Sequence, residues 1–214
     1  LATGGISYQN DKLNYNRIVS NLCLKTTDLT PSLSPLSVSS FPKELENKWI
    51  KCLVKLLNNN KVVKEEKGEV LFKKDGLSGI VIFNMSSYLA RKHISSFKDY
   101  QISLDLLPNF SSGEIKKMIN LNPSLEHIFI KEIADYLIKF KNIESMIKDL
   151  RFSIRGIYEF KFSQVTSGGV ALEELTQSYN LKKDSRIYLG GEFIDIDGEC
   201  GGYNIAFALC SGYY

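Results

Sequence analysis

The sequence predicts a mixed α/β chain of the α+β type, in which a middle region of antiparallel strands and helices lies between two glycine-rich ends. Three observations lead to this fold class. Residues 50–57 and 100–106 alternate with the period of two that is typical of half-buried strands. Residues 125–150 carry apolar stripes with helical spacing. Eight of the 15 glycines lie between Gly168 and Gly212, so the chain is expected to end in glycine-rich loops.

The first predicted element is an amphipathic helix over residues 11–25. Its apolar residues are spaced so that they share one face of the helix: Tyr15, Ile18, Val19, Leu22 and Cys23. Pro31 and Pro35 follow this helix. Because proline disfavours helical backbone in the residue before it, an extended stretch is expected there.

The strands of the middle region are expected to begin with a hairpin. Residues 50–57 form its first strand, and Asn58–Asn60 form its turn because asparagine tolerates the left-handed conformation that turns need. Val62 and Val63 begin the return strand. The next elements are expected to be a strand at 68–73, a loop at 75–79, a helix at about 80–91 and a strand at 100–106.

The rest of the middle region is predicted to be helical and then extended. Ser111 and Glu114 form a capping box, and Asn122 before Pro123 is the expected N-cap of a long helix that reaches residue 140. A shorter helix is expected at 143–150. Strands are then expected at 151–158, 160–165 and 187–192, followed by a buried apolar helix at 205–209.

Composition and charge exclude several classes of protein. The chain is 43% hydrophobic and 24% charged, which is typical of a folded protein rather than a disordered one. Its net charge of +3 is too small to indicate nucleic-acid binding. No run approaches the roughly 20 apolar residues of a membrane span, and the N-terminus lacks a signal-peptide pattern. We therefore expect a cytoplasmic protein with no nucleic-acid or membrane partner.

The cysteines and histidines do not predict a metal centre. Cys23, Cys52, Cys200 and Cys210 lack the spacing of zinc ligands, so buried free thiols and no metal site are expected. His93 and His127 are interpreted as surface or packing residues, and no catalytic acid or base can be assigned. The first residue is Leu1 rather than methionine, which indicates a fragment of a longer protein.

The strongest functional signal is a glycine-rich segment near the C-terminus. An apolar strand ends in Gly190 and Gly191, and Glu192 and Asp197 follow it. A carboxylate there can accept hydrogen bonds from a sugar-like chain, while glycine lets a ligand approach the backbone. For this segment alone, a tight turn with solvated acids is the alternative.

Further glycine loops make a bound cofactor more plausible than a chance turn. Residues 201–204 precede the predicted C-terminal helix, whose free N–H groups would stabilise a phosphate, a carboxylate or a reduced flavin. Residues 165–170 and residues 1–5 are two more strands that end in glycines. Three such loops in one chain favour an extended cofactor.

These segments resemble one family. LATGG at residues 1–5 is similar to the strand end of FAD domains of the glutathione-reductase type, and VTSGGV at 165–170 and GGEFIDIDGECGGYN at 190–204 resemble C-terminal signatures. GLSG at 76–79 and SLDLLP at 103–108 match the middle domain. The chain thus resembles the bacterial NAD(P)/FAD-dependent oxidoreductases, the aminoacetone oxidase-like flavoproteins, a group that also includes a bile-acid-pathway flavoprotein.

The resemblance implies a domain organisation. Residues 1–34 and 160–214 would form a partial, Rossmann-like FAD-binding domain, and residues 35–159 an inserted antiparallel β-barrel-like domain with a helical cap at about 108–150. An inserted domain leaves and rejoins its host at neighbouring points, so residues near 35 and 160 are expected to lie close together.

The resemblance also implies contacts with FAD. Glu192 would hold the ribityl chain, with Gly191 and Asp197 beside the ribityl and pyrophosphate region. The remaining expected cofactor contacts are Gly4, Thr166, Gly168, Gly169, Gly201, Gly202, Tyr203 and Asn204, of which the last four would contact the isoalloxazine ring. The implied partners are a small organic substrate and NAD(P)H, with the substrate between the flavin and the inserted domain.

Two departures from the family pattern leave two hypotheses open. The N-terminal unit with G-x-G-x-x-G, which would hold the pyrophosphate, is missing, and residues 9–14 replace a proline and glycine-rich turn. The first hypothesis is the C-terminal portion of an FAD-dependent oxidoreductase whose parent is an enzyme; the fragment itself is expected to be colourless and inactive. The second is a cofactor-free fragment or binding module that retains the fold.

Overall fold

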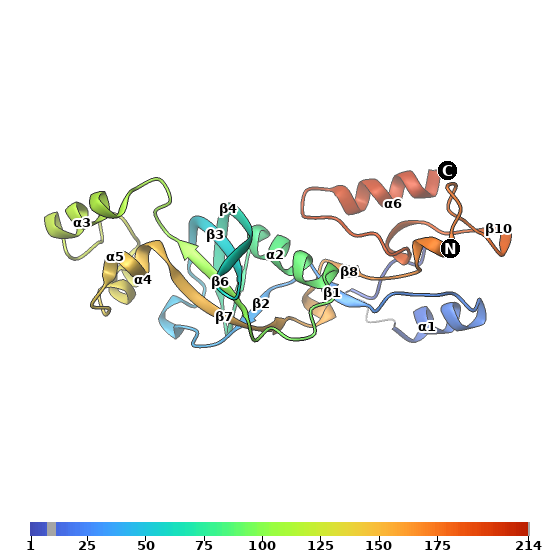
Figure 1. Cartoon of the computed structure of the whole chain (residues 1–214), viewed down its shortest axis with the longest axis horizontal. Coiled ribbons are helices and arrows are strands. Elements are labelled where there is room, and N and C mark those ends of the chain that lie inside the picture. Colours follow the sequence, from blue (N-terminus) through green and yellow to red (C-terminus); the bar gives the residue numbers. More distant parts are fainter. Residues whose placement is uncertain (8–11, 214) are drawn as a thin grey trace. The chain divides into compact units, whose positions relative to one another are not determined.

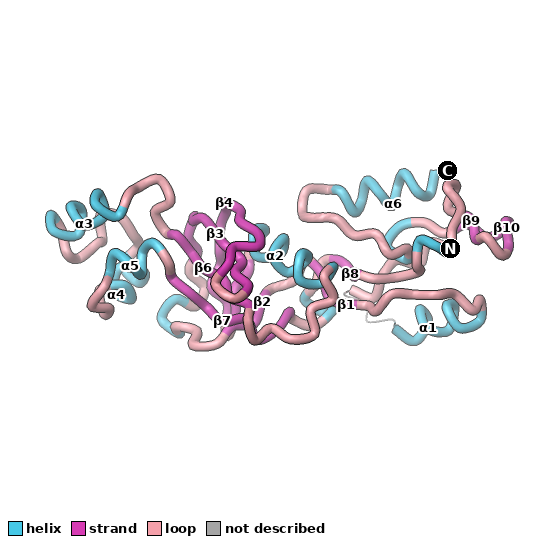
Figure 2. The backbone as a smooth tube through the Cα atoms, viewed as in Figure 1, coloured by secondary structure: helices cyan, strands magenta, loops and turns pink. Residues whose placement is uncertain are grey.

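The middle of the chain closes into a six-stranded antiparallel β-barrel (Figures 1 and 2). The computed structural model describes residues 1–7 and 12–213. The barrel strands, in the order in which they neighbour one another, are β2 (Leu36–Val38), β5 (Gly76–Ser78), β4 (Lys61–Lys73), β3 (Trp49–Asn58), β6 (Tyr100–Asp105) and β7 (Leu150–Ile157). The chain is mixed α/β, as the sequence predicts, and the barrel expected for its middle region is present.

The chain divides into two compact units. Unit 2 consists of residues 36–82 and 96–156 and contains the barrel; unit 1 consists of residues 1–35, 83–95 and 157–214. Helix α2 (Ile80–Arg91) contributes its first residues to unit 2 and the rest to unit 1. The two ends of the inserted segment do meet, because the Tyr158 N–H donates to the Pro35 carbonyl over 2.9 Å.

The hairpin of unit 2 forms where the sequence predicts it. β3 and β4 pair from Trp49 opposite Leu71 to Asn58 opposite Lys61, and Asn59 and Asn60 at the turn have φ angles of 49° and 63°. The left-handed conformation that favours asparagine is therefore used. One difference is that residues 61–73 form a single strand, because β4 pairs with β3 along nearly its whole length and then with β5.

The helices of unit 2 confirm one predicted start and correct another. α3 (Ser112–Leu121) begins with the predicted capping box of Ser111 and Glu114. The long helix expected from residue 123 to 140 is wrong: residues 123–130 are turns and bends, and α4 covers only Lys131–Leu137. The Asn122 N–H donates to the Met118 carbonyl and so caps the C-terminal end of α3. Leu125 has a φ of 60°, and its side chain is fully buried. α5 (Ile143–Lys148) follows.

Unit 1 is built from short elements and long connections. Its elements are α1 (Lys12–Asn21), β1 (Thr30–Ser32), β8 (Val165–Ser167), β9 (Asn180–Leu181), β10 (Asp184–Tyr188) and α6 (Tyr203–Tyr213), together with residues 83–95. β1 and β8 pair antiparallel. Leu1 donates to the carbonyl of Tyr188 and accepts from the Gly190 N–H, the pattern of a parallel ladder around Leu189.

Two expectations for unit 1 need correction, and two others fall on residues that the structure does not describe. Residues 160–165 were expected to be extended, but residues 160–162 form a 3-10 helix and only β8 is a strand, because the pairing with β1 starts at Val165. α1 ends at Asn21 rather than at residue 25. The expected helix start at residue 11 and the departure at residues 9–11 lie outside the described residues.

The core of unit 1 lies beneath these loops. It consists of Ile6, Tyr15, Leu24, Val170, Leu175, Leu181, Leu189, Phe193 and Ile194. Tyr15 packs edge-on against Phe193, with ring centroids 5.2 Å apart. The segments that carry the glycine loops are therefore anchored through apolar side chains directly beside the glycines.

The C-terminal helix is more exposed than the sequence predicts. α6 forms, but Ile205 and Leu209 are each 70% exposed, so the expectation of a buried helix is wrong. Only one side of α6 packs on unit 1, through Ala208 against Gly191 and Phe207 against Tyr179. No helix within the described residues is long and apolar enough to cross a membrane.

The cysteines follow the prediction only in part. All four are free thiols, but only Cys52 is buried, whereas Cys23 and Cys210 are exposed and Cys200 is intermediate. Cys23 and Cys210 lie on helix-end and helix surfaces that unit 1 leaves uncovered. In residues 1–7 and 12–213, no cluster of three or more histidine, cysteine or acidic residues could hold a metal ion.

Candidate functional site

All the candidate cofactor residues lie in unit 1. Of the three glycine loops predicted from the sequence, those at residues 1–5 and 165–170 meet, and the third segment at their meeting point is residues 190–192 rather than the loop at 201–204. The tightest meeting point consists of Gly5 near the N-terminus, Thr166 of β8 and Glu192 of the short 3-10 helix Gly191–Phe193. This point is the best-defined part of the candidate site.

Glu192 is held in place at this point by backbone. Its Oε1 atom accepts a hydrogen bond of 2.5 Å from the Thr166 N–H, and the Thr166 Oγ1 accepts from the Ile6 N–H over 2.9 Å. A Cβ at position 5 would overlap the Glu192 carboxylate, so only glycine leaves that carboxylate where it lies. Glu192 is thus a positioned acceptor rather than a solvated turn acid.

Burial raises the pKa of the Glu192 carboxyl above its ordinary value of 4.5. The hydrogen bond from the Thr166 N–H lowers this pKa, and the nearby negative charge of Asp197 raises it. The carboxylate is therefore partly desolvated, and an added hydroxyl donor would stabilise its charged form.

Gly168 and Gly169 are required by packing within the protein. A Cβ on Gly168, at a φ of 91°, would overlap the carbonyl of Asp28, and one on Gly169 would lie 2.8 Å from the backbone of Phe193 and Ile194. The Gly169 N–H donates to the Thr27 hydroxyl over 3.1 Å. Close packing of loops inside unit 1 therefore accounts for these two glycines.

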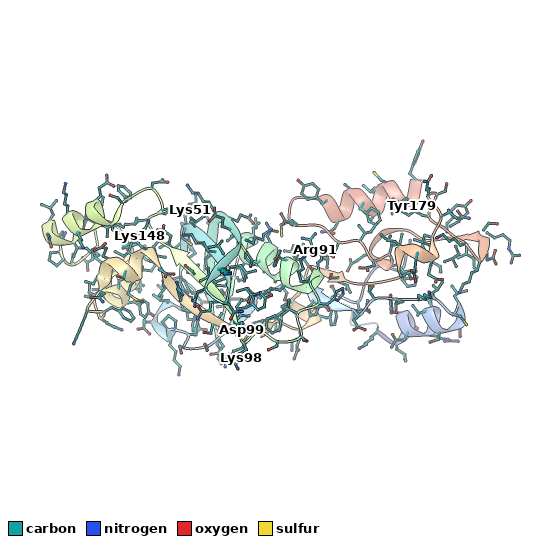
Figure 3. All side chains as sticks on the ribbon, in the orientation of Figure 1. Lys51, Arg91, Lys98, Asp99, Lys148 and Tyr179 are labelled. Atoms are coloured by element: carbon teal, nitrogen blue, oxygen red, sulfur yellow. The ribbon has the colours of Figure 1, made fainter. Side chains whose placement is uncertain are left out.

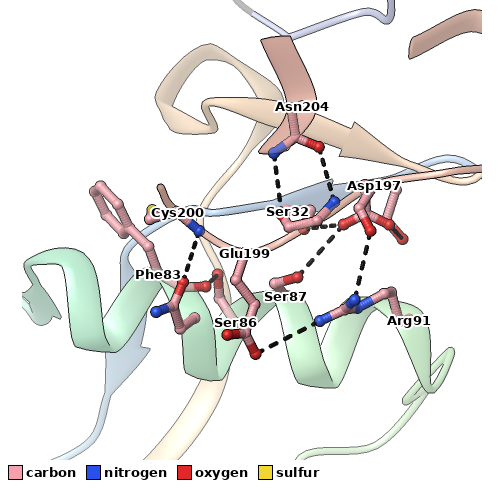
Figure 4. A network of polar contacts seen from close by, with 12 residues as sticks. Ser32, Phe83, Ser86, Ser87, Arg91, Asp197, Glu199, Cys200 and Asn204 are labelled. Carbon is pink, nitrogen blue, oxygen red and sulfur yellow. Dashed lines mark hydrogen bonds and ion pairs between the residues drawn. The ribbon is translucent and has the colours of Figure 1, made fainter. Parts of the chain in front are cut away.

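Asp197 lies at the centre of a polar network (Figure 4). Its carboxylate accepts hydrogen bonds from the hydroxyls of Ser32 at 2.8 Å, Ser167 at 3.0 Å and Ser87 at 3.4 Å. Arg91 donates to the Asp197 carbonyl over 3.4 Å. Burial raises the pKa of Asp197, while the serine hydroxyls and Arg91 lower it. Both carboxylate oxygens thus already have donors within the chain.

The loop before α6 is closed by an amide. The Asn204 side chain accepts from the Gly198 N–H over 2.8 Å and donates to the Gly198 carbonyl over 3.0 Å (Figure 4). The Cys200 N–H donates to the Asn84 side chain over 2.9 Å. Asn204 therefore shapes this loop, and Tyr203, which is 66% exposed, projects from the helix start.

Several of the predicted glycines do face open space. Gly4 and Gly202 have φ angles of 73° and 87°, and a Cβ at either position would meet nothing within 4 Å. At Gly201 a Cβ would approach only the Tyr203 ring. Gly191, at a φ of 66°, is different: its N–H donates to the Ser211 hydroxyl and its Cα faces Ala208 of α6.

The chemistry of these residues partly fits an FAD. A positioned, partly desolvated carboxylate at Glu192 suits the hydroxyls of a ribityl chain, and Gly4, Gly201 and Gly202 leave the backbone open to a ligand. Packing within unit 1 accounts for Gly168 and Gly169, and the Asp197 carboxylate already accepts hydrogen bonds from serine hydroxyls. The fit is therefore best at the Glu192 end of the candidate site.

Sequence reasoning did not identify the contribution of α2. Ser87 and Arg91 both bind Asp197, and Asn84 fixes residue 200, although this helix was expected to belong entirely to the inserted domain. A signal was available, because Asn84, Ser86 and Ser87 are polar residues in the middle of an otherwise apolar helix and all three are buried. Gly5 was also not singled out.

The histidines take no part in the candidate site. His93 and His127 are both exposed, as expected of surface residues. His127 belongs to unit 2, and His93 lies just beyond the end of α2. The site is accordingly one of acceptors, hydroxyls and open backbone, which can bind and orient a polar ligand.

Comparison with known proteins places the fold in context. Residues 30–152, more than half of the chain, match the family described as HI0933-like protein barrel and H2TH domain. A 3-dehydro-bile acid delta(4,6)-reductase of Clostridium scindens is 27% identical over 188 residues, which are 75% of this chain and 46% of that protein.

Two ribosomal RNA dihydrouridine synthases are also similar. The protein of Haemophilus influenzae is 24% identical over 169 residues, and that of Escherichia coli is 26% identical over 181 residues. These alignments cover 68% and 71% of this chain, but 40% and 44% of the two relatives. The chain thus spans less than half the length of the curated relatives that it matches.

Proposed function

The chain belongs to the HI0933-like protein barrel and H2TH domain family, and from this premise we propose that it is the C-terminal portion of an FAD-dependent oxidoreductase. The observation that carries the proposal is the Glu192 carboxylate, which the Thr166 N–H fixes against Gly5. A reductase among the relatives supports an oxidoreductase function.

The residues of unit 1 would bind the cofactor unevenly. Glu192 would accept hydrogen bonds from ribityl hydroxyls, and Gly4, Gly201 and Gly202 would let the cofactor approach the backbone. When bound, FAD supplies hydride transfer through its isoalloxazine ring. Gly168, Gly169 and Asp197 would act indirectly, by holding the loops that carry these contacts.

We propose a carbon–carbon double bond next to a carbonyl as the reacting group of the substrate. The name of the Clostridium relative describes the reduction of double bonds in a 3-oxo compound, and the names of the other two describe the formation of dihydrouridine. Both products arise by adding two hydrogens to such a bond. We further propose that NAD(P)H supplies the electrons and that the substrate is a small molecule.

Flavin binding tests the role of Glu192. The protein purified from the complete reading frame would be stripped of flavin and titrated with FAD by flavin fluorescence. Glu192→Ala removes a hydrogen bond to a charged group, worth about 1.5 to 3 kcal/mol, so FAD affinity should fall about 10- to 150-fold. Glu192→Gln should cost less, because an amide oxygen still accepts.

Glu173→Ala is the matched control. Glu173 is an exposed acid of unit 1 that pairs with Lys25, and its loss should leave FAD affinity unchanged. Equal dissociation constants for Glu192→Ala and the unaltered protein would remove Glu192 from the site. Oxidation of NAD(P)H with a 3-oxo-4,6-diene acid, but not with a uridine-containing RNA oligonucleotide, is the expected substrate result.

A binding module without redox activity is the second candidate. It is favoured by one observation: Asp197 and the two glycines after β8 are satisfied by partners inside the protein. A full-length protein that purifies without flavin and takes up none in the titration would support this alternative over the oxidoreductase.

A further inference from the structure

Two cavities lie next to each other on unit 2, and none of the candidate cofactor residues lines either of them. Their volumes are about 440 Å³ and about 430 Å³, and both are lined by Lys67 and Gly68 of β4. Each is in the size range of small-molecule sites. Every residue that lines them belongs to unit 2, so a ligand could bind there whether or not unit 1 binds a flavin.

The first cavity has an apolar wall that is already in place. Leu106, Leu107, Pro108 and Phe110 form this wall opposite Cys52 of β3. Burial, with the charge of Asp105, raises the pKa of the Cys52 thiol to about 12, so the thiol stays neutral at physiological pH. It contributes a small uncharged surface rather than a nucleophile.

A partly buried ion pair holds the wall segment. The Lys148 ammonium lies 2.6 Å from the Asp105 carboxylate and donates to the carbonyls of Leu107 and Phe110, each over 3.1 Å (Lys148 is labelled in Figure 3). The Asp105 carboxylate also accepts from the Leu107 N–H. This wall is therefore preorganised, and Lys148 balances the carboxylate behind it.

The charges around the first cavity favour an anion. Lys51 and Lys67 both line it, and its lining, as far as the structure describes it, includes no carboxylate. Lys51 forms an exposed ion pair with Glu69 at 3.5 Å, and Lys67 donates a long hydrogen bond of 3.4 Å to Asn109. Exposed pairs of this kind are weak and can be exchanged for a ligand carboxylate.

The second cavity offers an apolar surface instead. Trp49 and Ile80 line it with Leu71, and they are 59% and 64% exposed, so their apolar surface is open to a ligand. Glu66 and Glu69 also line this cavity, and their negative charges disfavour the binding of an anionic group there. The pair of cavities thus has a cationic part and an apolar part, joined at Gly68.

We propose that these cavities bind an apolar carboxylic acid, with the carboxylate at Lys51 and Lys67 and the hydrocarbon chain against Trp49 and Ile80. Gly68 pairs with Cys52 across the β3–β4 ladder, and Val81 packs closely against it, since a Cβ at position 68 would lie 3.2 Å from the Val81 side chain. The two cavities share Lys67 and Gly68, so a molecule that enters both would lie along this part of β4. An acid of medium chain length has the required combination of one charge and an apolar body.

The fluorescence of Trp49 provides a direct measurement, because it is the only tryptophan of the chain. Decanoate, kept below its micelle concentration, should change the emission of Trp49 in a saturable way, whereas decyltrimethylammonium should not. Lys51→Gln combined with Lys67→Gln should weaken decanoate binding about tenfold or more. Lys61→Gln, an exposed lysine of β4 outside both cavities, should bind as the unaltered protein does.

A second variant tests the apolar part separately. Ile80→Glu should also weaken decanoate binding about tenfold or more, and circular dichroism should show that each variant is folded. Three results would overturn the proposal: equal responses to decanoate and to the cationic amphiphile, unchanged binding in the double lysine variant, or a Trp49 response to an RNA oligonucleotide with none to decanoate.

Discussion

The two units of this protein hold their structure together by different means. In unit 2, long strands pair in regular ladders around fully buried side chains such as Phe72, Leu56 and Ile102. In unit 1, the strands have two to five residues, and the loops are joined by glycine contacts and by acids that bind hydroxyls and backbone. Buried apolar volume therefore contributes most to the stability of the barrel, whereas the structure of unit 1 depends mostly on individual close contacts and hydrogen bonds at single positions.

This difference matters for function. A barrel with a regular core tolerates changes on its surface, because its strands are defined by many repeated contacts. The candidate cofactor site depends on a few contacts between residues far apart in the sequence, such as that between the Thr166 N–H and Glu192. Substitutions that remove either buried apolar packing in unit 2 or individual contacts in unit 1 therefore test this comparison.

The largest effect is expected in the barrel core. Phe72 is 1% exposed and packs against Phe41 and Phe152, with ring centroids 6.4 Å and 6.1 Å away. Phe72→Ala should lower the free energy of unfolding by about 3 to 5 kcal/mol, because it leaves a cavity. Urea unfolding followed by Trp49 fluorescence measures this loss. Leu121→Ala, at a position 85% exposed on α3, should change it by less than about 0.5 kcal/mol.

A single methyl group should have a large effect in unit 1. Gly168→Ala forces a side chain into a φ of 91° and against the Asp28 carbonyl, for an expected loss of about 2 to 4 kcal/mol. Gly4→Ala has a similar φ of 73° but open space around it, and should lose only about 1 to 2 kcal/mol. Hydrogen exchange in peptides that cover residues 24–32 reports the difference; equal losses would contradict the packing role of Gly168.

A smaller, pH-dependent effect is expected at Glu192. Burial raises the pKa of its carboxyl in the folded protein above 4.5, so the unfolded chain releases this proton first as pH rises. Stability from this group is therefore present below the ordinary pKa and is lost as pH rises through the folded pKa. The glutamine in Glu192→Gln does not titrate, so this variant does not lose stability as the pH rises. Its stability relative to the unaltered protein should therefore increase between about pH 4 and pH 7.

The measurement is thermal unfolding of both proteins across this pH range. Asp197 remains in both, so its own titration cancels to first order in the difference. A stability difference that stays constant or falls with rising pH would show that the folded protein does not raise the pKa of Glu192.

The smallest effect is expected on the outer face of α6. Leu209 is 70% exposed, so Leu209→Ser should change the free energy of unfolding by at most about 0.5 kcal/mol. Urea unfolding is again the measurement. A loss above about 1.5 kcal/mol would mean that this face is buried and would restore the expectation drawn from the sequence.

The sequence predicted unit 2 better than unit 1, and the reason is physical. The β3–β4 hairpin, α2 and the capping box of α3 follow from alternation, asparagine turns and a local cap, all of which act over a few residues. The long helix after Asn122 failed because burying Leu125 at a positive φ outweighs helix periodicity. A local pattern has no information on such a competing tertiary contact.

The candidate site shows the same limit. Glycines and acids in the C-terminal segment could be singled out from sequence, and Glu192 was among them. That Gly5 and Thr166 position Glu192, and that α2 supplies Ser87 and Arg91 to Asp197, could not be predicted, because these residues are separated by tens to more than a hundred positions.

By itself, then, the sequence determined the local elements of this protein and the loops rich in glycine and acids, since hydrophobic period, turn residues and caps act within one element. Tertiary structure alone decided which glycines are needed for packing and which face open space, and which acids already have partners. Gly168 and Gly4 both lack a side chain and have φ angles of 91° and 73°, yet an added Cβ would overlap the Asp28 carbonyl at Gly168 and meet nothing within 4 Å at Gly4. Only the packing of distant segments distinguishes them.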